Sequence, residues 1–163
     1  MKRSVWRYAQ LIGIALIVVI LDQLTKSLVR LNIPLNTVFH PELWISMFFR
    51  LVHVENSGAA LGIFPGTGNL ILVIDLLIAL GIVIYYPRIP EDAKLLRLGM
   101  GLLLGGALGN PIDRLLFDGY VTDFISLLNI PVFNLADLSV VIGAILIYVG
   151  ASHQDRQKKS SPA

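Results

Sequence analysis

The chain has 163 residues, of which 55% are hydrophobic and 15% are charged, and its formal net charge is +2. A soluble domain has roughly a quarter of its residues charged, so this composition excludes an ordinary soluble globular fold. The cations form no basic stripe that would favour nucleic-acid binding, and the absence of cysteine excludes disulfides, thiolate metal sites and a thiol nucleophile.

Four apolar segments are long enough to cross a membrane as helices. A helix needs about 20 residues to span roughly 30 Å of hydrocarbon. The predicted spans cover residues 8–29, 70–86, 95–112 and 135–151, with approximate bounds. The expected fold class is therefore an all-α membrane protein, one integral membrane domain over residues 1–163, in which the spans and the loops at their ends must do any chemistry.

The first span follows a basic start, as a secretory signal peptide also does. No small-x-small cleavage site follows, and the apolar run leads directly into Asp22-Gln23-Leu24-Thr25-Lys26, so we expect a retained span. Asp22 and Lys26 are four residues apart on one helix face, which predicts an ion pair. The simplest interpretation is that the pair neutralises itself at the membrane boundary, with the lysine extending toward water.

The loop between the first two spans covers about residues 30–69. Between Trp44 and Phe64 it mixes aromatic, β-branched and glycine residues, which is typical of short strands and turns. We expect a small strand-rich element at the outer membrane surface. It contains the motif Asn56-Ser57-Gly58-Ala59-Ala60.

The second and third spans contain unusual residues. Asp75 is a lone acid within the second span, for which we expect a structural role. Two interpretations of its charge stay open, a protonated carboxyl and a pair with a polar group on a neighbouring helix. Gly101, Gly105 and Gly109 repeat the G-x-x-x-G spacing, which favours close packing of another helix. Pro111 is expected to bend or end the third helix.

The distribution of Lys and Arg predicts the topology. Of the 13 such residues, one end of the spans has only four, which are Lys26, Arg30, Arg50 and Arg114. The positive-inside rule therefore places both termini and the connection at about 87–94 in the cytoplasm. The tail after the fourth span, about 154–163, is predicted to be disordered.

Polar residues gather at the outer ends of the spans, where an ionisable group is costly and usually functional. They form five clusters, at residues 22–26, 56–60, 105–114, 121–125 and 133–137. The predicted topology places all five at the same face of the membrane.

Asp123 and Asp137 are the strongest candidates for catalysis. Each is flanked by apolar residues, so each carboxyl should be partly desolvated. Two such carboxylates brought together share a proton, and one acts as acid and the other as base, as in aspartic proteolysis. Structural interpretations stay open: Asn134 capping the fourth span with Asp137 in its first turn, and Asp123 in a turn after Asp118-Gly119.

Other chemistries fit the sequence less well. The three histidines, His40, His53 and His153, are isolated and lack metal-ligand spacing. No G-x-S-x-G elbow, P-loop or dinucleotide fingerprint is present. A small ion or solute transporter that uses membrane-embedded carboxylates remains the alternative, and a structural scaffold would not explain why the acids and asparagines cluster on one side.

The five clusters, in this order on four spans, resemble the bacterial lipoprotein signal peptidases (signal peptidase II) over nearly the whole chain. The resemblance implies an aspartic dyad of Asp123, in the V-x-D-F motif, and Asp137, in the F-N-x-A-D motif. Supporting or substrate-positioning roles are implied for Asp22, Lys26, Asn56, Gly58, Asn110, Asp113, Arg114 and Asn134.

The same resemblance implies the substrate and the location. The expected reaction removes the signal peptide of a prolipoprotein, cutting before a diacylglyceryl-modified cysteine, without a metal or other cofactor. Lipid-modified prolipoproteins and membrane lipid are the expected partners. The site is expected at the outer face of the bacterial cytoplasmic membrane.

Three positions depart from the family pattern. Leu61 stands where an aromatic residue usually follows Gly-Ala-Ala, Pro111 stands inside the G-N-x-I-D-R motif, and Leu138 replaces a small hydroxyl residue. None of them removes an expected catalytic group. They affect the expected shape of the lipid pocket and the bend below Arg114.

Overall fold

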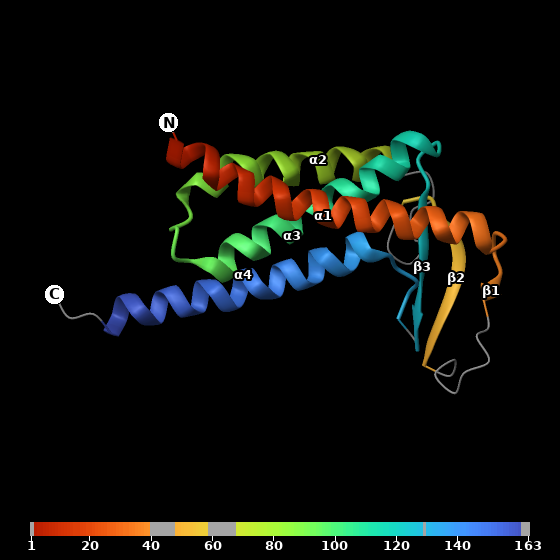
Figure 1. The fold of residues 1–163 in the computed structure, drawn as a ribbon. Helices are drawn as coiled ribbons and strands as arrows, with labels where there is room; N and C mark the ends of the chain where they lie inside the picture. The colour runs from red at the N-terminus through yellow and green to blue at the C-terminus, as the bar shows by residue number, and fades with distance from the viewer. Residues whose placement is uncertain (1, 40–47, 59–67, 129, 161–163) are drawn as a thin grey trace.

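The structure, a computed structural model, describes residues 2–39, 48–58, 68–128 and 130–160. Four long helices lie side by side, and a small sheet stands at one end of them, away from the start of α1 and the end of α4 (Figure 1). The helices are α1 (Lys2–Asn32), α2 (Gly68–Tyr85), α3 (Lys94–Leu116) and α4 (Leu135–Ser160), with a 3-10 helix η3 (Tyr86–Arg88) after α2. The strands are β1 (Val38–Phe39), β2 (Phe49–Asn56) and β3 (Val121–Leu127).

The four predicted spans are confirmed as helices that are long and apolar enough to cross a membrane. The apolar helical segments are Tyr8–Asn32, Gly68–Arg88, Lys94–Leu116 and Leu135–Gln154, each a few residues longer than predicted. Large apolar side chains such as Leu16, Leu77 and Ile145 are exposed on them. A contiguous apolar surface of this kind is suited to contact with lipid.

Two helices extend further than the sequence predicted. Pro111 does not end α3, which continues to Leu116, because tertiary contacts of Asp113 and Arg114 hold the turn beyond the proline. The predicted disordered tail is helical as far as Ser160, because an existing helix extends through good helix-forming residues without a new nucleation step. Residues 161–163 lie outside the described part of the chain.

Helix α3 lies at the centre and packs against α1, α2 and α4. The predicted close approach along its glycine stripe is confirmed, since a Cβ added at Gly101 would lie 2.7 Å from Ile14 of α1. A second face of α3 is also closely packed, against α4, since a Cβ added at Gly99 would lie 2.7 Å from the carbonyl oxygen of Gly143. Glycines on two faces therefore let both neighbouring backbones approach α3 closely.

The sheet is antiparallel, in the order β1-β2-β3. The predicted strand-rich element is present, since β2 lies inside the expected segment, whereas residues 44–47 and 59–64 fall outside the described residues. Strand β3 was not predicted. Its residues Phe124 and Ile125 pack with Val29 and Ile33, so the sheet is fixed on the end of α1.

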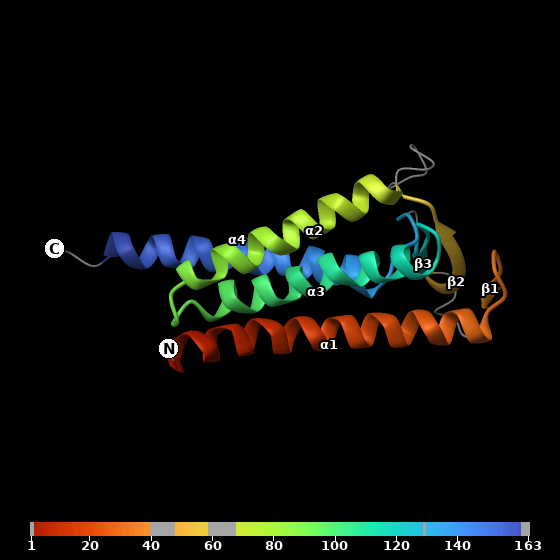
Figure 2. The same ribbon diagram turned by 90° about the horizontal axis from the view of Figure 1, so that it is seen from above.

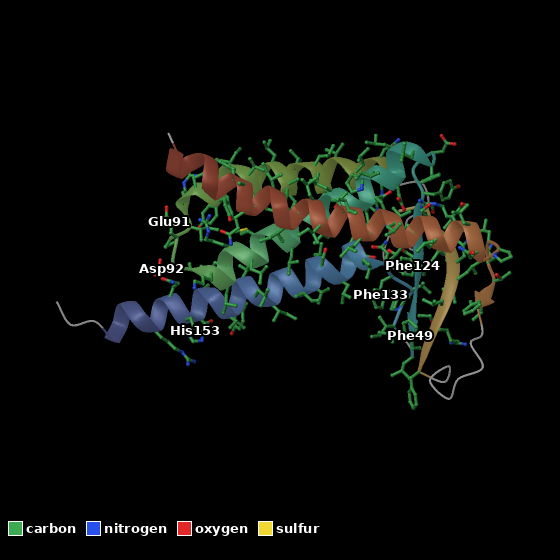
Figure 3. All side chains as sticks on the ribbon, in the orientation of Figure 1. Phe49, Glu91, Asp92, Phe124, Phe133 and His153 are labelled. Carbon is green, nitrogen blue, oxygen red and sulfur yellow. The ribbon has the colours of Figure 1, made fainter. Side chains whose placement is uncertain are left out.

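The two ends of the molecule differ in character. Phe49, Phe124 and Phe133 lie at the sheet end, whereas Glu91 and Asp92 lie at the opposite end (Figure 3). Seen from above, α2 diverges from α1 toward the sheet end (Figure 2). The five polar clusters, as far as they are described, lie at this sheet end, as the sequence predicted.

Candidate active site

A cavity of about 900 Å³ lies at the sheet end, among α2, α3, α4 and the sheet. One part of its wall is polar and includes Asn56, Asp75, Asn110, Arg114, Asp123 and Asp137. The rest is largely apolar and includes Ile71, Leu127, Ile130, Phe133, Leu138 and Val141. Both candidate acids therefore line one cavity that also has apolar walls.

Asp123 lies within β3, opposite Val54 of β2, so the turn interpretation is wrong. Asp123 is buried, with only 3% of its surface exposed. Its Oδ1 accepts a hydrogen bond from Asn134 Nδ2 at 2.7 Å, and its Oδ2 accepts one from Asn56 Nδ2 at 3.0 Å. Each oxygen keeps a lone pair for a further donor such as water.

Asp137 lies in the first turn of α4 and forms a reciprocal cap with Asn134. The backbone N–H of Asp137 donates to Asn134 Oδ1, and the backbone N–H of Asn134 donates to Asp137 Oδ2, both at 3.1 Å. The capping interpretation is therefore confirmed. The cap leaves Asp137 Oδ1 free to accept a bond from Asn110 Nδ2 at 2.8 Å, so the same carboxylate also faces the cavity.

Backbone donors fix the orientation of two of the amides. Asn134 Oδ1 must face the N–H of Asp137, and Asn56 Oδ1 accepts the N–H of Gly58 at 3.1 Å. Gly58 has φ +144°, a conformation that favours glycine. Because an amide oxygen that faces a donor leaves its NH₂ group pointing elsewhere, both side chains present donors to Asp123.

Lys26 fixes the third amide. It is fully buried, and its Nζ donates to Asn110 Oδ1 at 2.8 Å. An ammonium has donors only, so Asn110 must turn its NH₂ group toward Asp137. The predicted ion pair with Asp22 is confirmed at 2.8 Å, but the lysine does not extend toward water, because Asn110 and Asp113 supply acceptors inside the protein.

The two buried carboxylates beside Lys26 hold the backbone next to each candidate acid. Asp22 Oδ1 accepts the N–H of Ala136 at 2.9 Å, and Asp113 Oδ2 accepts the N–H of Thr122 at 3.0 Å. Ala136 precedes Asp137 and Thr122 precedes Asp123. One lysine thus ties together both segments that carry the acids.

Asp75 has a polar partner on a neighbouring helix, which is one of the two possibilities that the sequence left open. Its Oδ2 lies 2.9 Å from Arg114 Nη1 on the neighbouring helix α3, and both residues line the cavity. Among the residues that the structure describes, the buried Nε of Arg114 has no hydrogen-bond partner. Contacts within this part of the protein therefore do not satisfy all donors of Arg114.

The structure brings together every described candidate from the sequence at this end of the molecule. Ala59, Ala60 and Leu61 lie outside the described residues. Sequence reasoning missed Gln23, whose Nε2 donates to Asp113 Oδ1 at 3.0 Å. It also missed Arg30 and Thr122. The helical spacing of Gln23 and Arg30 around Lys26 was a signal that could have placed both on its face.

The electrostatics of Asp123 differ from those of an exposed carboxyl. Burial is the main cause that raises the pKa of Asp123, to about 6; hydrogen bonding from Asn56 opposes the shift and the charge on Asp137 adds to it. Neither Asp123 nor Asp137 forms an ion pair within the described part of the chain. The charge of Asp137 therefore adds to the cost of ionising the buried Asp123.

Comparisons with known proteins identify the family of the chain. The profile of the signal peptidase (SPase) II family, Peptidase_A8, matches residues 14–152. The chain belongs to the signal peptidase II family. As the family supports, it is a peptidase that removes signal peptides from prolipoproteins, and it is a multi-pass protein of a bacterial membrane.

Individual signal peptidase II relatives cover most of the chain. The lipoprotein signal peptidase of Moorella thermoacetica is 44% identical over 134 residues, 82% of this chain and 87% of its own. That of Bacillus subtilis is 37% identical over 150 residues, 90% of this chain and 95% of its own. A bacterial membrane enzyme solved by the in meso method at 2.3 Å resolution is similar with a TM-score of 0.80 and 34% identity, over 94% of this chain and 93% of its own.

The raised pKa of Asp123 gives a spectroscopic prediction. At pH 5 an ordinary aspartate is ionised, since its pKa is about 3.9, whereas Asp123 should still hold its proton. The infrared carbonyl band of protonated carboxyl groups should contain a component that is lost as the pH rises through about 6. This component should be missing in Asp123→Asn. Asp92→Asn changes an exposed acid and is the control, which should keep this component. An Asp123-dependent band that is already lost by about pH 4 would contradict the assigned environment.

Proposed function

We propose that this signal peptidase II is an aspartic endopeptidase in which Asp123 and Asp137 activate a water molecule. The observation that carries the proposal is the shared partner Asn134, which donates to Asp123 from its amide and to Asp137 from its backbone. Two carboxyls joined through one residue, on one cavity and without a cation of their own in the described region, have the properties of a proton-sharing pair.

The chemistry follows from the different surroundings of the two acids. Asp123 is more costly to ionise and holds the shared proton, which it places on the oxygen of the scissile carbonyl. Asp137 takes a proton from the water molecule while the water oxygen attacks the carbonyl carbon. When the C–N bond breaks, Asp137 returns its proton to the leaving nitrogen and Asp123 recovers one from the tetrahedral intermediate, so the pair is reset.

The surrounding donors orient the reacting groups. Asn56, Asn110 and Asn134 hold the four carboxyl oxygens, so that neither acid needs to reorganise during the reaction. Arg114 lines the cavity with its guanidinium paired to Asp75, and we propose that it binds a backbone carbonyl of the substrate. Such contacts position the scissile bond beside the pair.

The apolar part of the cavity suggests how a lipidated substrate is recognised. Leu138 and Val141 of α4 line the cavity and are exposed, and we infer that the cavity opens toward the lipid-facing surface at these residues. We propose that the acyl chains of a diacylglyceryl-cysteine enter from this side and bring the bond before the cysteine to the acids. Burial contributes about 0.8 kcal/mol per methylene. Both termini would then be cytoplasmic, with the site at the outer face.

Removal of either acid should abolish turnover. Asp123→Asn and Asp137→Asn should each lower kcat by about a thousandfold or more, because an amide cannot take or return a proton. Cleavage of a lipidated precursor by purified protein, followed by mass spectrometry, measures this effect. Asp92→Asn, an exposed change at the opposite end, is the matched control.

Two results would contradict the aspartic mechanism. Turnover within about tenfold of the unchanged enzyme in either variant would remove that residue from the proton transfers. Loss of activity in a chelator, restored by zinc, would favour metal-assisted hydrolysis instead. We expect activity to persist in the chelator.

The acyl chains should also decide which precursors are cut. The unlipidated precursor should be cleaved at least about a hundredfold more slowly than the lipidated one, and casein should not be cleaved, because most of the binding comes from apolar burial. Matched lipidated and unlipidated forms of one precursor provide the measurement. Equal rates for the two forms would contradict the proposed recognition and leave the aspartic mechanism untouched.

A further inference from the structure

We propose that Arg30 and Thr122 are positioning residues, which hold strand β3 so that Asp123 faces the cavity in its working orientation. Arg30 comes from α1 and Thr122 directly precedes Asp123, so the link joins a membrane-spanning helix to the strand that carries one acid. The inference rests on the proposed function, in which Asp123 is catalytic.

The link is a short, directed hydrogen bond. Arg30 Nη1 donates to Thr122 Oγ1 at 2.9 Å and lies 3.7 Å from Asp113 Oδ2. The same Asp113 oxygen accepts the backbone N–H of Thr122 at 3.0 Å. Arg30 and Asp113 therefore hold the side chain and the backbone of one residue together.

Thr122 is held through its backbone N–H and its hydroxyl, by Asp113 and Arg30. The residue is only 3% exposed. Because successive side chains of a strand point to opposite faces, fixing Thr122 toward α1 and Asp113 directs Asp123 the other way, into the cavity.

Arg30 is itself held in place. Its guanidinium carbon lies 4.4 Å from the centroid of the Phe117 ring, which fixes the plane of the group. It follows Lys26 by one turn of α1, so the two cations share a helix face. Lys26 acts through Asn110 on Asp137, and Arg30 acts through Thr122 on Asp123. A planar guanidinium suits this fixed geometry better than a flexible ammonium.

The test compares four variants of the full-length enzyme on the lipidated precursor. Thr122→Val removes the hydroxyl and keeps the side chain at nearly the same shape. It should lower kcat about tenfold because Asp123 is misplaced, and it should leave KM within about twofold because the binding cavity is unchanged. Thr122→Ser keeps the hydroxyl and should restore kcat to within about twofold of the unchanged enzyme. Arg30→Ala should lower kcat at least as much as Thr122→Val, and the double variant should be no slower than Arg30→Ala, since the arginine change already breaks the link to Thr122.

The matched controls change the same residue types elsewhere. Thr37→Val removes an exposed hydroxyl that donates to the carbonyl oxygen of Pro34 in its own turn, and Arg88→Ala removes an exposed guanidinium that donates to the carbonyl oxygen of Ile84. Both should keep kcat within about twofold.

Each outcome decides between the two proposals. Turnover by Asp123→Asn would overturn the proposed function itself. An inactive Asp123→Asn together with full kcat in Thr122→Val or Arg30→Ala would overturn only the positioning role. Additive losses in the double variant, or no rescue by serine, would also overturn it. Should Thr122→Val lack a cooperative thermal transition, the kcat of folded Arg30→Ala decides the question.

Discussion

The site depends on the buried ammonium of Lys26 and on the two carboxylates that share it. Asp22 and Asp113 both pair with Lys26, and each also accepts the backbone N–H of the residue before a candidate acid. A buried charge is tolerated only when it is paired and hydrogen-bonded, so none of the three groups can be lost alone without leaving the others uncompensated. The charge that makes the network stable also sets the distance between α4 and β3.

Directionality extends this constraint to the acids. Lysine and backbone N–H groups can only donate, so each amide that accepts from them must turn its own donors toward Asp123 or Asp137. The cations are balanced by other acids: Lys26 and Arg30 lie beside Asp22 and Asp113, and Arg114 pairs with Asp75. The two acids thus receive neutral donors, which orient them without placing a cation beside either carboxylate.

Features set by local sequence could be predicted, whereas those set by distant contacts could not. The apolar spans, the Asp22–Lys26 pair and the glycine stripe each follow from spacing within one helix, and all are confirmed. Strand β3 was missed because its residues read equally as a membrane-edge loop until β2 pairs with it. The bonds of Thr122 to Asp113 and Arg30 join three separate elements, and no pattern within one segment specifies them.

The orienting role of Lys26 is tested most directly by the turnover of Asn110→Asp on a lipidated precursor. An aspartate at this position keeps an acceptor for Lys26 but presents no donor to Asp137. The account predicts a folded protein whose kcat is lower by at least about a hundredfold, comparable to the loss of one preorganised donor in other active sites. A folded variant with kcat within about threefold of the unchanged enzyme would contradict it.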